Sequence, residues 1–248
     1  RDAGSNNVVN GQSAWVQVFG DDSFIDYAFE FARKYAPEGC KLFYNDYNEY
    51  IPEKRDDICK KVAELKEKNL IDGVGMQSHI KMGSPSIALY EEAIRKYADL
   101  GVEVQITELD IDQKSNSASD LSQLAERYQE VFKMYKKVKD DGVNLTAVTI
   151  WGINDGNSWI GGYPLLFDND FQAKQCFYAI ADTDSQIQST KNVNAIKVDS
   201  MGNDHAFEVQ KANYVGDNSF KVIPSSPTTN KIPSVTLFKF IINQLFQE

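Results

Sequence analysis

The residues best suited to chemistry are two carboxylates near the end of an apolar run. The stretch VQITELDI at residues 104–111 is rich in β-branched residues, and Glu108 and Asp110 stand two positions apart within it. In a strand, residues two apart point to the same face, so these carboxylates would lie side by side. Such a pair could act as a general acid and a general base. Taken alone, a strand-end Glu-x-Asp is more often a loop salt bridge or a helix cap.

Polar and aromatic side chains also follow three other apolar runs. The residues at these ends are Asn45, Tyr47, Asn48, Gln77, His79, Trp151, Asp155, Asn157 and Trp159. Amides and carboxylates can hydrogen-bond sugar hydroxyl groups, and aromatic rings pack on the apolar faces of pyranose rings. Because all the runs end in groups of this class, the pattern predicts a sugar-binding site. Taken alone, Trp151 would also fit a core, whereas Trp159 stands in a glycine-rich loop and fits one less well.

His79 is one of only two histidines in the sequence. It could keep Glu108 ionised and oriented, with Asp110 fixing the other imidazole nitrogen. A lone histidine is more often a structural group whose hydrogen bonds are satisfied. A metal could use the same three side chains, but one histidine without further His or Cys ligands is a weak ligand set. We therefore predict no metal and no cofactor.

The elements that would position these side chains alternate between strands and helices. Strands are expected over 41–47, 73–79, 102–111 and 145–151, and helices over 21–36, 52–65, 84–100, 120–139 and 172–181. Residues 1–20 are expected to form a loop. Four successive strand–helix units imply a parallel sheet with helices outside it, and an α/β barrel normally contains eight such units.

The pattern changes after residue 182. Three short segments with alternating apolar and polar residues predict antiparallel strands at 195–198, 206–215 and 220–223, and the proline- and serine-containing stretch 224–230 predicts a linker. We therefore divide the chain into residues 1–182, the α/β part, and residues 183–248, a β-rich tail.

Composition limits the classes of partner. The chain of 248 residues is 42% hydrophobic and carries a formal net charge of −10. Phosphate binding needs a basic surface, so a nucleic-acid partner is not expected. A membrane span is not expected either, because the longest apolar stretch, at 235–246, is shorter than eighteen residues and contains a lysine. The sequence shows no signal-peptide pattern, but it begins at Arg1 without an initiating methionine, so this absence decides nothing about location.

Four motifs in order resemble those of strands 5, 6, 7 and 8 of glycoside hydrolase family 10 xylanases. They are YNDYN at 44–48, GVGMQSH at 73–79, ITELD at 106–110 and WGINDGNSW at 151–159. The resemblance covers about residues 12–182. It implies a (β/α)8 TIM barrel, of which this chain holds about the C-terminal half, and retaining hydrolysis of β-1,4-xylan by a secreted enzyme.

The resemblance also implies a role for each matching position. Glu108 matches the catalytic nucleophile, His79 and Asp110 match the pair that tunes it, and Asn45, Tyr47, Gln77, Trp151 and Trp159 match substrate-binding positions, the two tryptophans as aromatic walls of the cleft.

One family feature is missing. Retaining glycosidases need a second carboxyl group as acid/base, and the family carries it in a Trp-Asp-Val-Val-Asn-Glu motif that ends strand 4. Residues 8–11 read VVNG and look similar only superficially, with glycine in the place of the acid, because Gln12 to Phe19 resembles the segment that follows the strand-4 loop. We therefore interpret residues 1–20 as that loop and expect strand 4 to lie upstream of this sequence. Glu49 is a conceivable stand-in, although the family pattern gives it no such role.

Three hypotheses follow. The leading one is a xylanase half that is inactive or poorly active alone, with the missing N-terminal half, or self-association, covering its open edges. The second is a non-catalytic xylan-binding or structural fragment. The third, an unrelated α/β enzyme, is disfavoured by the four ordered motifs.

Overall fold

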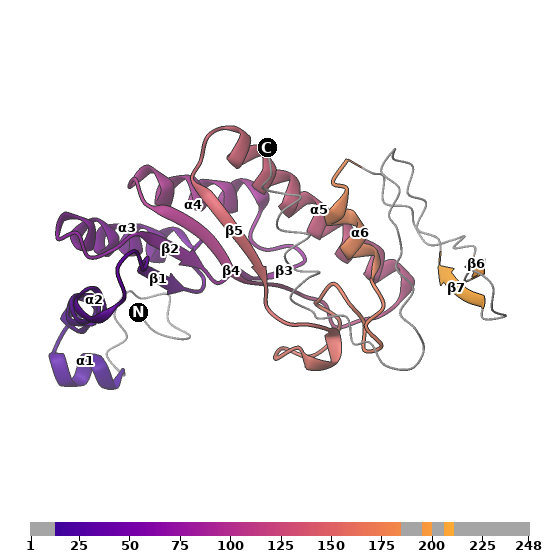
Figure 1. Cartoon of the computed structure of the whole chain (residues 1–248), viewed down its shortest axis with the longest axis horizontal. Helices are drawn as coiled ribbons and strands as arrows, with labels where there is room; N and C mark the ends of the chain where they lie inside the picture. Colours follow the sequence, from indigo (N-terminus) through magenta and orange to yellow (C-terminus); the bar gives the residue numbers. More distant parts are fainter. Residues whose placement is uncertain (1–12, 185–194, 200–205, 211–248) are drawn as a thin grey trace. The chain divides into compact units, whose positions relative to one another are not determined.

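The computed structural model describes residues 13–184, 195–199 and 206–210 (Figure 1). These residues fall into two compact units. The first contains the residues up to Asp112 together with Lys133–Trp151, and the second contains Gln113–Phe132 and the residues from Gly152 onward. The long helix α5 (Ala118–Asp140) contributes residues to both units.

The first unit is built on a parallel sheet, as predicted. Its strands are β1 (Phe43–Asp46), β2 (Gly73–Met76), β3 (His79–Lys81), β4 (Glu103–Asp112) and β5 (Leu145–Ile150). β4 is central: it pairs with β2 and β3 along one edge and with β5 along the other, while β1 pairs with β2. Among the described strands, β1 and β5 therefore form the two edges of the sheet.

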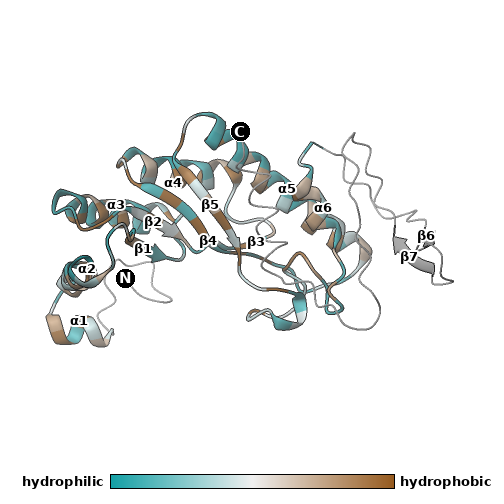
Figure 2. Ribbon diagram, viewed as in Figure 1, coloured by the Kyte–Doolittle hydropathy of each residue, from teal (hydrophilic) through white to brown (hydrophobic). Residues whose placement is uncertain are grey.

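Three longer helices accompany the sheet in the first unit. They are α2 (Ser23–Tyr35), α3 (Pro52–Glu67) and α4 (Ile87–Asp99). α3 packs against α4, and α4 packs against β4. Figure 2 shows apolar and polar residues alternating along α3 and α4. The buried side chains of these two helices include Ile58, Val62, Leu65, Tyr90, Ala93, Ile94 and Tyr97. Each large buried side chain contributes roughly 1.5–3 kcal/mol to folding.

The prediction that residues 1–20 form a loop is wrong for its described part. A short helix, α1 (Ala14–Phe19), ends at Gly20, whose φ of 82° places it in the left-handed region and whose N–H donates to Val16 O at 2.7 Å. Glycine adopts this conformation without a steric penalty, so it is the usual residue after a helix. Six residues are too few to give a recognisable helical period, which is why the pattern missed α1.

Strand β4 contains a β-bulge at residues 107–109, which include Glu108. On one side, Ile106 pairs with Met76 and Asp110 with His79, so three residues of β4 oppose two residues of the neighbouring chain segment. On the other side, a register shift lies between Ile106 and Leu109. β4 thus has one extra residue relative to both neighbours, and such bulges redirect side chains.

The expected single strand over 73–79 is interrupted opposite this bulge. β2 ends at Met76 and β3 starts at His79, and Ser78 between them has a φ of 64°. A non-glycine residue rarely adopts positive φ without support from surrounding contacts. The interruption keeps both segments in register with β4.

The second unit contains the N-terminal part of α5, a short 3-10 helix η1 (Asp155–Asn157), and α6 (Gln175–Ala181). It also contains the antiparallel pair β6 (Ala195–Asp199) and β7 (Ala206–Gln210), which lie where two of the tail strands are expected. The predicted strand at 220–223, the end of the strand at 206–215 and the linker at 224–230 lie outside the described residues. No helix within the described part of the chain is both long enough and apolar enough to span a bilayer.

Candidate active site

The end of β4 brings both carboxylates to one histidine. Nε2 of His79 lies 3.3 Å from Oε2 of Glu108, and Nδ1 of His79 lies 3.0 Å from Oδ1 of Asp110. The two carboxylates are therefore on the same face of the strand, as their spacing predicts. They differ in access to solvent, because the Glu108 side chain is 15% exposed and that of Asp110 only 1%.

The surrounding charges favour a protonated His79. Burial alone would lower its pKa, but the hydrogen bond and negative charge of Asp110, together with the charge of Glu108, outweigh burial and raise the pKa above its ordinary value. When both ring nitrogens carry a proton, each can donate to one carboxylate. His79 is thus placed to donate one hydrogen bond to Glu108 and one to Asp110.

The amide of Asn45 contacts Glu108 from the neighbouring part of the sheet. Its Nδ2 donates to Glu108 Oε1 at 2.9 Å, and its Oδ1 accepts from the hydroxyl of Thr107 at 2.6 Å. Thr107 and Glu108 are consecutive, yet both reach Asn45, and the bulge explains why. The Glu108 carboxylate also assigns the orientation of the amide, since an ionised carboxylate only accepts hydrogen bonds and therefore requires the amide nitrogen on its side.

Gly75 provides the space in which Asn45 lies. A Cβ at Gly75 would come within 2.4 Å of Asn45 Oδ1 and 3.0 Å of Thr107 Cγ2. The sequence prediction did not include Gly75 or Thr107 in the site. The only sequence feature pointing to Gly75 is the glycine spacing of GVG within the second motif, which suits a close approach of neighbouring groups.

Tyr47 and Gln77 lie at the ends of the neighbouring strands. The Lys54 ammonium lies 3.9 Å from the centroid of the Tyr47 ring, and the same ammonium forms a buried ion pair with Asp46 at 2.7 Å. The backbone N–H of Gln77 donates to Asp46 O at 2.9 Å. The half-buried Tyr47 and Gln77 side chains are thus attached to a firmly held part of the sheet.

Trp151 follows β5 and is held through its backbone. Its N–H donates to Leu109 O at 2.9 Å, in the strand that carries Glu108. Its side chain is 44% exposed. The alternative that Trp151 is a core residue is therefore wrong in this structure.

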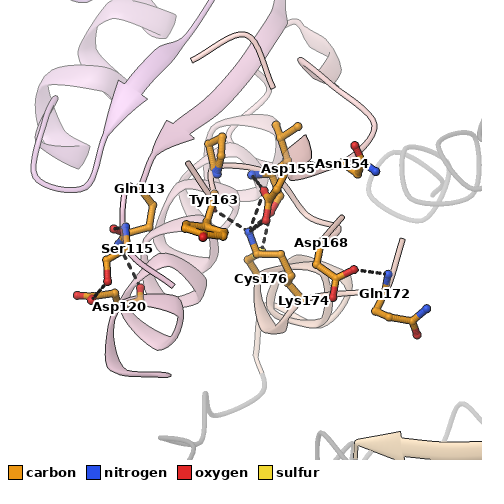
Figure 3. A network of polar contacts seen from close by, with 12 residues as sticks. Gln113, Ser115, Asp120, Asn154, Asp155, Tyr163, Asp168, Gln172, Lys174 and Cys176 are labelled. Carbon is orange, nitrogen blue, oxygen red and sulfur yellow. Dashed lines mark hydrogen bonds and ion pairs between the residues drawn. The ribbon is translucent and has the colours of Figure 1, made fainter. Parts of the chain in front are cut away.

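Trp159 belongs to the second unit, in the loop between η1 and α6. Its side chain is 63% exposed. The loop is closed by Asp155 and Lys174, whose Nζ lies 3.1 and 2.9 Å from the two carboxylate oxygens and also donates to Tyr163 O and Leu165 O at 2.8 and 2.7 Å (Figure 3).

Asp155 thus differs from the carboxylates of β4, although all of them occupy strand-end positions in the sequence. It is almost fully buried, its Oδ1 accepts from the Leu165 N–H at 2.9 Å, and its own N–H donates to Phe167 O at 2.9 Å. These contacts connect both ends of the loop. Asp155 shapes the loop that carries Trp159 and offers no accessible oxygen for chemistry.

Glu49, the conceivable stand-in acid, is fully buried and accepts hydrogen bonds from Ser78. A catalytic acid must reach the bond that it protonates, so its burial argues against that role. Within the described residues, no group of three or more His, Cys, Asp or Glu side chains has an arrangement suited to a metal ion.

Comparison with known proteins extends this picture. Residues 3–183 match the model of Glycosyl hydrolase family 10. The chain is 48% identical over 179 residues to endo-1,4-beta-xylanase Y of Acetivibrio thermocellus, covering 69% of this chain and 16% of the relative. It is 39% identical over 189 residues to an endo-1,4-beta-xylanase of Geobacillus stearothermophilus, covering 68% of this chain and 56% of the relative.

Solved structures agree. An intracellular xylanase from Thermoanaerobacterium saccharolyticum has a TM-score of 0.64 and 38% identity, covering 71% of this chain and 54% of that chain. The carbohydrate-binding and catalytic modules of a Clostridium thermocellum xylanase, complexed with xylohexaose, have a TM-score of 0.63 and 44% identity, covering 74% and 36%. The chain thus spans between 16% and 56% of the length of these relatives.

Proposed function

The chain belongs to glycosyl hydrolase family 10, and from that premise we propose that it is the nucleophile-bearing half of a retaining endo-β-1,4-xylanase. In this proposal Glu108 is the nucleophile. The observation that carries the proposal is the contact of Glu108 with Asn45 on one oxygen and with His79 on the other. This arrangement fixes the carboxylate while leaving its side chain partly exposed.

The chemistry follows from the two-step route of retaining glycosidases. The ionised Glu108 attacks the anomeric carbon, the glycosidic bond breaks, and a covalent glycosyl-enzyme forms that water then hydrolyses. Attack requires the unprotonated carboxylate. His79 supports that state through its positive charge, and Asp110 fixes the imidazole through the opposite nitrogen.

The second carboxyl group comes from outside the described part of this chain. Asp110 is 1% exposed and already bonded to His79, and Glu49 is fully buried. Neither suits an acid/base residue, which must lie about 5–5.5 Å from the nucleophile in a retaining enzyme. We infer that the N-terminal half of a (β/α)8 barrel supplies this group.

The sheet edges favour the same conclusion. β1 and β5 each have a single partner among the described strands, and exposed strand edges tend to pair with further strands. In the proposed barrel, β1 corresponds to strand 5, β2 and β3 together correspond to strand 6, β4 corresponds to strand 7, and β5 corresponds to strand 8. A second copy of the chain could cover an edge but would supply no family-type acid/base.

Xylan is the proposed substrate. Tyr47, Gln77 and Asn45 lie at neighbouring strand ends and present groups that can bind sugar hydroxyls. Relatives are named as xylanases, and one solved relative is in complex with xylohexaose. Extracellular location stays a prediction, since one similar structure is described as an intracellular xylanase.

A non-catalytic xylan-binding fragment is the second candidate. Trp151 and Trp159 are 44% and 63% exposed, and exposed tryptophans can bind sugar rings without any nucleophile. This function predicts that the chain binds xylo-oligosaccharides equally well with Glu108 intact or replaced, and that it never contributes to hydrolysis.

Reconstitution distinguishes the two candidates. The chain would be co-expressed with the N-terminal half of a family relative, and xylan hydrolysis would be compared between the unchanged chain and Glu108→Ala. Loss of the nucleophile should lower kcat at least about 10⁴-fold. Glu103→Gln, at the opposite end of the same strand, is the matched control and should retain activity. Hydrolysis that persists in Glu108→Ala would exclude the nucleophile role.

Covalent trapping gives an independent test. A 2-fluoro-xylobioside with a dinitrophenolate leaving group needs no acid for the first step, and the fluorine slows release of the sugar from the enzyme. Mass spectrometry of the reconstituted protein should find the sugar on the peptide that contains Glu108. A label on any other residue would contradict the assignment.

A further inference from the structure

A buried glutamate that the proposed mechanism does not use lies behind His79. Glu49 directly follows the first motif and its side chain is completely buried. Its Oε1 accepts two hydrogen bonds from Ser78, one from the backbone N–H and one from the hydroxyl, both at 3.1 Å. Its Oε2 has no hydrogen-bond partner among the described residues. The contacts of Glu49 are therefore directed at the residue that precedes His79.

Ser78 lies where the pairing register with β4 changes between β2 and β3. It has positive φ and lies between β2 and β3, where two residues oppose three residues of β4. This conformation is unfavourable for serine unless contacts hold it. If Ser78 relaxed, His79 would lose its place opposite Asp110, because β3 begins at His79.

Helices α4 and α5 hold the same turn from the side of the core. The hydroxyl of Tyr90 donates to the Ser78 hydroxyl and also bonds the Tyr135 hydroxyl at 2.7 Å. The hydroxyl of Tyr97 donates to the backbone carbonyl of Glu49 at 2.7 Å. All three tyrosines are buried. Buried networks of this kind fix one geometry, because an unmade bond is costly in a low-dielectric interior.

The surroundings of Glu49 favour its neutral form. Burial raises the pKa of its carboxyl group to about 7, against the hydrogen bond from Ser78. The nearby Lys54 ammonium is bonded to Asp46 instead. A neutral side chain with one accepting oxygen is what glutamine also provides, so glutamine should replace Glu49 at this position.

We propose that Glu49 is a positioning residue: it holds Ser78 in its left-handed conformation and so keeps the His79 imidazole between Glu108 and Asp110. Glu49 itself contacts neither substrate nor the reacting atoms. The catalytic consequence rests on the proposed function, whereas the placement of the imidazole does not.

Imidazole NMR of the intact chain tests the placement directly. His79 and His205 are the only histidines, so a nitrogen-15 spectrum contains two ring systems and His205 serves as the internal reference. Glu49→Ala should lower the pKa of His79 by about half a unit or more, because its contact with Asp110 loosens. Glu49→Gln should leave that pKa within about 0.2 units.

Two further variants separate positioning from general loosening. Val62→Ala removes buried volume on α3 outside the hydrogen-bonded network and should leave the His79 titration unchanged. Ser78→Ala keeps the backbone bond to Glu49 but loses the hydroxyl, and should move the pKa of His79 in the same direction by a smaller amount. If Glu49→Ala fails to fold, Ser78→Ala decides. An unchanged His79 titration in the folded variant overturns the proposal.

The reconstituted enzyme supplies a second readout. Glu49→Ala should lower kcat at least tenfold with KM within about twofold, and Glu49→Gln should restore kcat. Equal losses in both variants would contradict positioning through an accepted hydrogen bond. If the reconstituted enzyme has no Glu108-dependent hydrolysis, the proposed function fails, while the NMR result still decides the role of Glu49.

Discussion

The two units use carboxylates in opposite ways. In the first unit, Glu108 and Asp110 share a histidine, and Glu108 remains partly exposed. In the second unit, Asp155 is paired with Lys174, and their side chains are only 1% and 8% exposed. All three carboxylates belong to strand-end motifs, so their sequence context alone does not separate them.

The cation explains the difference. A histidine has an ordinary pKa near 6.5 and can change charge near neutral pH, whereas a lysine stays charged there. Lys174 also donates to two backbone carbonyls, Tyr163 O and Leu165 O, which ties the charge to the path of the loop. The partly exposed pair of His79 and Glu108, in which the histidine can change charge, suits catalysis. The buried pair of Lys174 and Asp155 suits a structural role.

Breaking the buried pair should give the largest effect. Lys174→Met leaves the Asp155 carboxylate buried without its cation, which should destabilise the second unit by about 3–5 kcal/mol. Urea unfolding and hydrogen exchange of residues 152–174 would measure the loss. Lys137→Met, in an ion pair whose lysine is 59% exposed, should change stability by at most about 1 kcal/mol. Similar losses in both variants would contradict the proposed distinction.

The buried Glu49 should give the first unit a pH-dependent stability. Its pKa is raised from 4.5 to about 7, so the folded state binds a proton that the unfolded state has already released. The contribution of Glu49 to the free energy of unfolding should therefore be greatest below pH 4.5. It should fall by at most about 3 kcal/mol as the pH rises to about 7. Glu49→Gln should remove this slope, and an unchanged slope would assign it to another group.

Adding one methyl group at Gly75 should disturb the first unit without touching a charge. Gly75→Ala places a Cβ against the amide of Asn45, so Asn45 must move and its hydrogen bond to Glu108 is lost. Overpacking of this kind costs about 1–3 kcal/mol. Thermal unfolding and the kcat of the reconstituted enzyme would report it. Gly83→Ala, with open space around the added atom, is the control.

Much of the first unit was predictable because its periodicity is strong. The apolar, β-branched run at 104–111 predicted the strand, and the spacing of Glu108 and Asp110 predicted their common face. The bulge was not predictable, because Thr107 fits a strand whether it points inward or outward. The turn at Ser78 was missed for a related reason: positive φ at serine depends on long-range contacts with Glu49.

The roles of individual residues in the second unit were less predictable. Asp155 lies in a strand-end motif, and its partner Lys174 is 19 residues away in sequence. Nothing in the local sequence pattern shows whether Asp155 forms a buried ion pair or contacts a substrate. A buried lysine that follows the loop is visible as a partner only once the chain has folded.

The smallest effect should come from His79, and its sign separates it from Glu49. The pKa of His79 is raised because Asp110 and Glu108 outweigh burial, so its stabilising contribution is complete below about pH 6.5 and is lost as pH rises through the folded pKa. This pH-dependent part of the unfolding free energy should be smaller than about 1 kcal/mol, and His79→Asn should remove it. It should begin roughly two pH units above the pH at which the contribution of Glu49 begins to fall. Urea unfolding from pH 4 to 9 in Glu49→Gln, His79→Asn and the double variant resolves the two windows. If His79→Asn flattens the curve below pH 6 instead, the imidazole is not held by these carboxylates, and the contrast with the lysine pair of the second unit does not stand.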